Sequence, residues 1–147
     1  MRTWLLLLAA VLFVSFYTAP GCAADPAECD LISKIQEYVS QCELVAMYGP
    51  SESGRKKGIA ELRKQFASDI AKLKERAAKE KGVFKELQDA LSQFDANLAQ
   101  CSKCEHEYRN LVIDLTMFES CKAKFCGPTD KAKRKILGMA WKCRKGK

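Results

Sequence analysis

The chain has 147 residues, a formal net charge of +7, eight cysteines and one histidine. This length suits a single domain with a modest core. The sequence has one histidine, no glycine-rich phosphate loop and no nucleophile elbow, so it contains none of the common catalytic motifs that these residues make up. We therefore expect a protein that is not an enzyme, with no cofactor and no metal site.

Residues 1–24 are typical of a secretory signal peptide. Arg2 supplies the positive start, residues 4–17 are uncharged and mostly apolar, and small residues follow at Gly21, Ala23 and Ala24. An apolar run of 14 residues is short for a membrane span, which needs about 20. We expect cleavage after Ala24 and a secreted, extracellular protein, because no second long apolar run follows.

The residues after this point predict a helix. Asp25 is suited to the N-cap and Pro26 to the first helical position. Apolar residues then recur at helical spacing, at Leu31, Ile35, Val39, Cys42 and Ala46. Residues 48–54, with two glycines and a proline, predict a loop.

Two further apolar stripes flank Gly82. The first contains Ile59, Leu62, Phe66, Ile70, Leu73 and Ala77, and the second runs from Phe84 through Leu87, Leu91, Phe94, Leu98 and Cys101 to Tyr108, Val112 and Leu115. A single helix of about 60 residues would be about 90 Å long and would need a partner along its whole length. We favour a turn at Gly82, beside the charged residues 79–81. The predicted fold is all-α: a disulfide-stapled bundle of three to four helices in one domain, residues 25–147.

A basic helix is predicted over residues 129–143. Cys126, Gly127 and Pro128 predict a break, after which Thr129 or Asp130 can cap the helix. Its apolar side is expected to hold Ile136, Leu137, Ala140, Trp141 and Cys143.

The positive charge of the protein belongs to this last segment. Residues 122–147 hold ten basic side chains and one acidic one, whereas residues 25–121 have a net charge of −3. We expect a partner-binding surface on the basic helix; the alternative is a core-packed helix whose lysines are merely solvated. The expected contact residues are Lys131, Lys133, Arg134, Lys135, Trp141 and Lys142.

Seven cysteines remain after the predicted cleavage, at positions 29, 42, 101, 104, 121, 126 and 143. Cys101 and Cys104 form a C-x-x-C pair, which can be a redox site, half of a zinc site with Cys121 and Cys126, or two disulfide anchors. The pair lies in a helical stripe without a preceding strand, and disulfides persist outside the cytosol. We therefore favour disulfide anchors, and we regard His106, between two glutamates, as a solvated surface residue.

A register argument gives a disulfide prediction. If the helices turn back at Gly82 and near residue 51, Cys104 lies level with Cys42. We expect Cys42 to bond with Cys101 or Cys104. The remaining member of that pair and Cys121, Cys126 and Cys143 would then form two more bonds among themselves. Cys29 is then left over and is available for a disulfide-linked homodimer.

Secreted, disulfide-rich chains with a cationic helix are common among toxins and effectors, so we expect a toxin-like effector. Its partner would be an ion channel, a receptor or an anionic membrane surface. Nucleic acid is not expected, because no aromatic stacking pattern accompanies the basic residues. One alternative is a carrier of small apolar ligands lined by Phe66, Phe84, Phe94 and Tyr108; another is an extracellular matrix protein that holds polyanions.

Overall fold

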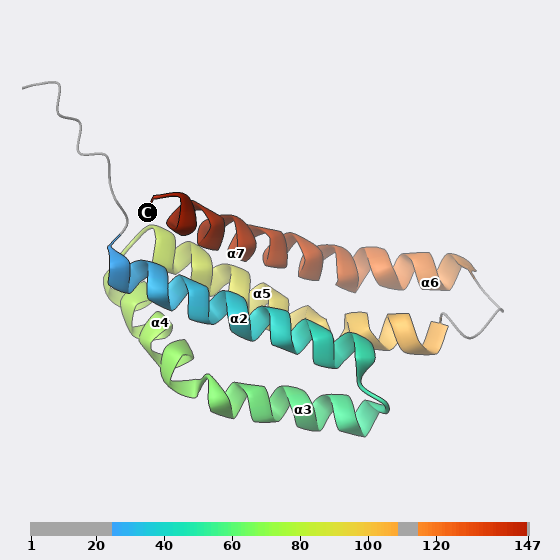
Figure 1. Cartoon of the computed structure of the whole chain (residues 1–147). Coiled ribbons are helices and arrows are strands. Elements are labelled where there is room, and N and C mark those ends of the chain that lie inside the picture. The colour runs from blue at the N-terminus through green and yellow to red at the C-terminus, as the bar shows by residue number, and fades with distance from the viewer. Residues whose placement is uncertain (1–24, 109–114, 147) are drawn as a thin grey trace, which may run out of the picture.

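The computed structural model describes residues 25–108 and 115–146, and that part of the chain is a helical bundle stapled by three disulfides, as expected (Figure 1). The predicted signal peptide, residues 1–24, lies outside the described residues. The helices are α2 (Pro26–Tyr48), α3 (Glu52–Gln65), α4 (Ala67–Lys79), α5 (Val83–Lys103), α6 (Leu115–Cys121) and α7 (Gly127–Lys145). One π-helical turn, Cys104–Tyr108, extends α5, and a second, Lys122–Cys126, joins α6 to α7.

Helices α2 and α5 form the middle of the bundle. They run side by side in the same direction, with α3 and α4 on one side and α7 on the other (Figure 1). This arrangement gives four helical rods, because α3 leads into α4 and α6 leads into α7.

Asp25 caps α2 as predicted, and its side chain accepts a hydrogen bond from the Ala27 N–H at 3.1 Å. The two predicted turns, after α2 and at Gly82, are also present. The loop after α2 is shorter than expected, because Ser51 caps α3 by accepting a hydrogen bond from the Gly54 N–H at 3.0 Å. At the other turn Gly82 has a φ of +114°, a conformation that side-chain-bearing residues rarely adopt, so the helix ends there and the chain turns back.

The structure has one bend that the sequence did not predict. Phe66 interrupts the rod between α3 and α4 with a φ of −95° and a ψ of 10°. Its ring is buried, and its centroid lies 5.6 Å from that of Tyr38 on α2. The two helices therefore follow an arc around the α2–α5 layer instead of a straight line (Figure 1).

The core lies where the apolar stripes meet. All five predicted stripe residues of α2 are buried, and so are the α5 residues Phe84, Leu87, Leu91, Phe94 and Leu98. Helix α7 adds Ala132, Ile136, Ala140 and Cys143. The stripe was extended too far, since Leu115 is 81% exposed and Val112 lies outside the described residues.

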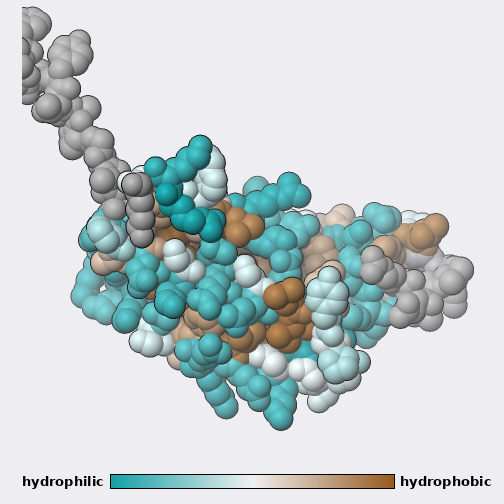
Figure 2. Space-filling view, in the orientation of Figure 1, coloured by the Kyte–Doolittle hydropathy of each residue, from teal (hydrophilic) through white to brown (hydrophobic). Residues whose placement is uncertain are grey.

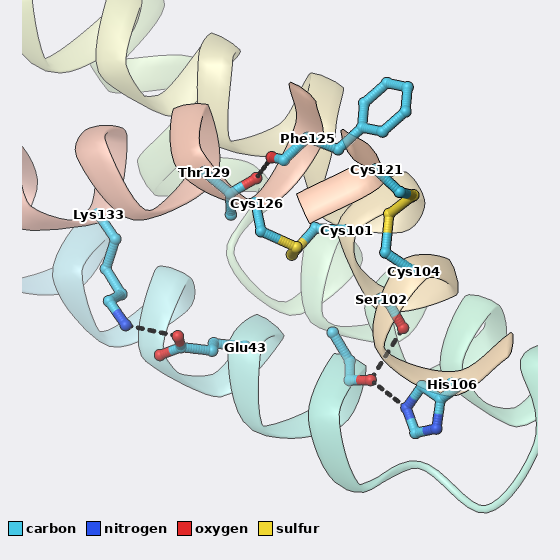
Figure 3. The surroundings of a disulfide bond; sticks show 11 residues. Glu43, Cys101, Ser102, Cys104, His106, Cys121, Phe125, Cys126, Thr129 and Lys133 are labelled. Carbon is cyan, nitrogen blue, oxygen red and sulfur yellow. Dashed lines mark hydrogen bonds and ion pairs between the residues drawn. A yellow bond between two sulfur atoms is a disulfide. The ribbon is translucent and has the colours of Figure 1, made fainter. Parts of the chain in front are cut away.

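The predicted break before α7 is absent. The π-helical turn Lys122–Cys126 continues directly into α7, so the helix begins two residues earlier than expected and ends at Lys145. Pro128 is accommodated because it sits in the first turn, where a backbone N–H is not required. Thr129 is not the N-cap: its hydroxyl donates to the Phe125 carbonyl at 2.7 Å (Figure 3).

Hydrophilic residues cover most of the face in view (Figure 2). Among the described helices, none is both long and apolar enough to cross a bilayer. Three disulfides within one chain are typical of proteins outside the cytosol.

Candidate functional site

Disulfides hold both ends of α7. Cys143, near its last turn, is bonded to Cys29 in the first turn of α2. Cys126, directly before its first residue, is bonded to Cys101 at the end of α5 (Figure 3). A third bond, between Cys104 and Cys121, fixes the adjoining π-helical turn. The helix is thus attached to both central helices before any side-chain packing is considered.

Two of the predicted contact residues are used inside the protein. The Lys133 ammonium donates to the Glu43 carboxylate on α2 at 2.5 Å, and both side chains are partly buried (Figure 3). The Lys135 ammonium lies 3.4 Å from the Glu86 carboxylate on α5. These two lysines add to the attachment of α7 and are less available to a partner.

Three other predicted contact residues and Lys145, which was not predicted, point away from the bundle. Lys131, Arg134, Lys142 and Lys145 are all exposed. At 100° per residue they share an arc of about 100° with Trp141, on the side of the helix opposite the buried residues. We call these five residues the cationic face.

The cationic face is not neutralised from within. None of its four cations lies within 4.0 Å of a carboxylate of the described residues. Asp130 is the one acidic residue of α7, and it does not lie within 4.0 Å of any described cation either. Lys145 instead contacts Trp141, with its ammonium 4.1 Å from the centre of the indole ring. The face therefore carries four positive charges with no counter-charge in direct contact.

The structure corrects the position of Trp141. We expected it on the apolar side of the helix with Ile136 and Ala140, but it is 52% exposed and lies on the opposite side. Its hydrophobicity suggested the core, whereas its helical phase excludes it from the core. A large aromatic ring therefore lies at the surface, in contact with the Lys145 ammonium.

The predicted disulfide pattern was wrong. Cys42 is unpaired and buried, and Cys29, predicted to be the odd cysteine, is bonded to Cys143. In this structure Cys29 therefore has no thiol for a disulfide between two copies of the chain.

The register explains the error. The contacts Tyr38–Asp95 and Ala46–Ser102 separate α2 and α5 by 57 and 56 residues, so Cys42 is level with residue 98 or 99 and not with Cys104. Because of the bend at Phe66, α3 and α4 advance less along the bundle axis than a straight helix of the same length would. Residues of α5 that lie level with Cys42 therefore have lower numbers than expected. Cys101 and Cys104 face the α6–α7 rod instead (Figure 3).

The C-x-x-C pair is a pair of disulfide anchors, and this excludes the zinc alternative in this structure. All four cysteines of the proposed zinc spacing are consumed in two S–S bonds and are not thiolates. Among the described residues, no group of three or more His, Cys, Asp or Glu side chains could hold a metal ion.

His106 is not simply solvated. Its Nε2 lies 3.1 Å from the Ala46 carbonyl, which also accepts a hydrogen bond from the buried Ser102 hydroxyl at 2.9 Å (Figure 3). A carbonyl only accepts, so Nε2 carries the hydrogen. The histidine thus donates a hydrogen bond to a backbone carbonyl near the C-terminal end of α2. We had not predicted this structural role, because the two glutamates beside His106 suggested a solvated residue.

The unpaired Cys42 lies beside a polar cluster in the interior. The Tyr38 hydroxyl donates to Asp95 at 3.1 Å and accepts from the Arg63 guanidinium at 3.3 Å. Burial raises the pKa of the Cys42 thiol to about 11, and burial together with Asp95 raises the pKa of Tyr38. A buried thiol that stays protonated is a poor nucleophile, so this cluster supports packing and not catalysis.

The aromatic residues of the carrier alternative pack into the core. Phe66, Phe84 and Phe94 are at most 4% exposed, and the Tyr108 side chain lies outside the described part. Four grooves of the described surface are lined by both charged and uncharged side chains, and none of the three phenylalanines lines them. The structure thus offers no support for a ligand among these rings.

Comparisons with protein-family models, curated proteins and solved structures found no match to this chain. The functional argument therefore depends on the geometry of the molecule.

Proposed function

We propose that this protein is a secreted, non-enzymatic, toxin-like effector that binds an anionic surface of its target through the cationic face of α7. The target surface could belong to an ion channel, a receptor or a membrane. The observation that carries the proposal is the face itself: four cations without a carboxylate partner in the described structure share one side of α7 with an exposed tryptophan.

The bundle supports this role by holding α7 rigid. The disulfides at its two ends and the ion pairs of Lys133 and Lys135 keep the backbone of the helix in one place. A face that is already ordered loses less conformational entropy when it binds. The unpaired charges also attract an oppositely charged surface over a distance of about one Debye length, about 8 Å at physiological salt.

The two alternatives differ in how much support they have. A carrier role would need an apolar cavity, and three of its four expected lining residues, Phe66, Phe84 and Phe94, are buried in the core. A matrix role would use the same cationic face to bind polyanions, so it differs from the proposal in biological setting and not in the site.

Neutralising the cationic face tests the proposal. The variant K131Q/R134Q/K142Q removes three charges from it, and K57Q/K64Q/K74Q removes three exposed charges from α3 and α4 that also lie within 4.0 Å of no described carboxylate. The two variants have the same net charge, so any difference reports where the charge lies.

The measurement is the salt concentration that elutes each protein from a sulfonate cation exchanger at pH 7, after circular dichroism has shown equal helix content. We expect the α7 variant to elute at clearly lower salt than the α3–α4 variant. Equal elution would mean that net charge and not the cationic face governs binding, and it would overturn the proposal.

A further inference from the structure

Two runs of three basic residues lie in helices of this protein. The α3 run is Arg55-Lys56-Lys57, near the start of α3, and the α7 run is Lys133-Arg134-Lys135. Serine endoproteases of the secretory pathway recognise paired basic residues and cut the chain on their carboxyl side. Both runs carry the same charge, so a difference between them as protease substrates comes from the part of the fold in which each lies.

The α3 run lies in the longest segment of the described chain that has no buried side chain. Every one of residues 47–65 is exposed or half-buried, whereas the α7 run is flanked by the buried Ala132 and Ile136. A protease binds several residues of its substrate in an extended conformation, so the helix around the cut must first open. Opening requires less free energy where no buried contact is lost, and the rate of cutting follows the fraction of opened chain.

Polar contacts at or near the surface hold the start of α3. Ser51 caps the helix, Lys56 lies 2.6 Å from Glu52, and Arg55 donates to the Gly49 carbonyl at 3.4 Å. Helix α3 contains no cysteine, and Figure 1 shows it at the edge of the bundle. Helix α7, in contrast, is attached by disulfides at both ends. The α3 run can therefore open locally, while the α7 run cannot open without disturbing the core.

A cut in the α3 run leaves the two parts of the protein joined. Residues 25–57 contain Cys29, which is bonded to Cys143, and the unpaired Cys42. The other two disulfides lie entirely after residue 57. The buried residues of α2 end at Ala46, so none of them lies in the segment that opens. The product is two chains, held together by one disulfide and by the same core.

We propose that a secretory serine endoprotease specific for paired basic residues cuts this protein at the α3 run and converts it into two disulfide-linked chains. Hydrolysis consumes one water molecule: the peptide bond after Lys57 breaks, Lys57 gains a carboxylate and Gly58 gains an amino group. The inference rests on the secretion that the proposed function includes, and not on the cationic face, which stays intact in the two-chain protein.

Trypsin tests the local opening, because it cuts after any lysine or arginine and so accepts both runs. The folded chain lacking residues 1–24, and the same chain reduced, alkylated and unfolded, are digested for short times. Mass spectrometry gives the cutting rate at each run, and the rates in the unfolded chain correct for sequence preference. We expect folding to slow cutting at the α7 run at least about tenfold more than at the α3 run. Equal slowing at the two runs would overturn the inference.

Removal of the N-cap tests whether opening of α3 limits the cut. Ser51→Ala removes the acceptor of the Gly54 N–H, and Ser33→Ala is the matched control at an exposed site inside α2. We expect Ser51→Ala to speed cutting at the α3 run about fivefold without changing the α7 run, and Ser33→Ala to change neither by more than about twofold. An unchanged rate at the α3 run of Ser51→Ala would contradict the inference.

The full chain is then expressed in cultured cells that cut a co-expressed reporter protein after paired basic residues. The intact mass of the protein in the medium is measured before and after reduction. We expect one species before reduction and two chains after it. Lys56→Gln and Arg134→Gln each replace the middle residue of one run and leave no adjacent basic pair there. Lys56→Gln should remain one chain after reduction, whereas Arg134→Gln should still separate into two.

Two outcomes of this expression experiment overturn the inference. If the secreted protein stays one chain after reduction while the reporter is cut, the α3 run is not a processing site. The proposed function is then judged by the α7 charge variant alone. If the protein does not reach the medium although the reporter does, the secretion in the proposed function is refuted, and the inference fails with it.

Discussion

Removal of the Cys29–Cys143 bond should destabilise the protein more than removal of either other staple. The bond joins residues 114 apart, and the Cys101–Cys126 bond shortens that loop by about 25 residues. The chain-entropy relation gives about 4.5 kcal/mol for closing a loop of this size. The Cys104–Cys121 bond spans 17 residues, which corresponds to about 3 kcal/mol or less.

The comparison uses C29A/C143A and C104A/C121A, each of which loses two sulfur atoms. Urea unfolding at pH 7 gives the free energy of unfolding of each variant. With a slope of about 1.5 kcal/mol per molar urea, a loss of 4.5 kcal/mol lowers the midpoint by about 3 M, compared with 2 M or less for the shorter loop. If C104A/C121A were the less stable variant, loop length would not govern the contribution of these bonds, and the reasoning would be refuted.

Three further predictions follow from the interior and from the glycines. In the chain lacking residues 1–24, Cys42 should be the one free thiol and should react with a thiol reagent at pH 8 only after urea unfolds the protein. Its folded pKa is about 11, against about 9 when unfolded, so stability should fall as the pH rises above about 9, by about 1.4 kcal/mol at pH 10. Cys42→Ala should remove most of this dependence up to pH 10, and the raised pKa of Tyr38 should account for the rest; equal slopes for both proteins would contradict the prediction. Tyr38→Phe should cost about 1–2 kcal/mol in urea unfolding, because Asp95 and Arg63 each lose a partly buried hydrogen bond, and a cost near zero would show that water replaces the hydroxyl. Gly138→Ala should stabilise the protein by about 0.5–1 kcal/mol and Gly82→Ala should destabilise it by about 1 kcal/mol or more, since both sites are open but only Gly82 has a positive φ; thermal melts with shifts of the same sign would refute this.

Periodicity was a sound guide to the helices. The spacing of apolar residues in α2 and α5 predicted which side chains are buried, because each helix must turn one face to the core. The turn at Gly82 was also predictable, since a glycine beside three charged residues is a poor interior for a long helix. These conclusions needed only local information.

The sequence did not predict which residues of different helices lie at the same level. The pairing of Cys29 with Cys143 depends on where α7 lies against α2, and the register of Cys42 depends on the bend at Phe66. Each of these relative positions depends on every turn and bend between the two residues. An error of a few residues in the register therefore assigns a cysteine to the wrong partner. Trp141 was misplaced for a different reason, because hydrophobicity was given more weight than helical phase.

The sequence by itself determined that this protein is helical, that its cysteines are suited to disulfides, and that its positive charge lies at the C-terminal end. These properties follow from composition and spacing, which folding does not alter. Only the tertiary structure decided which cations α2 and α5 neutralise and which remain on the cationic face with Trp141. The physical reason is that a lysine is available to a partner only if no carboxylate from another helix lies within reach, and that distance is set by packing.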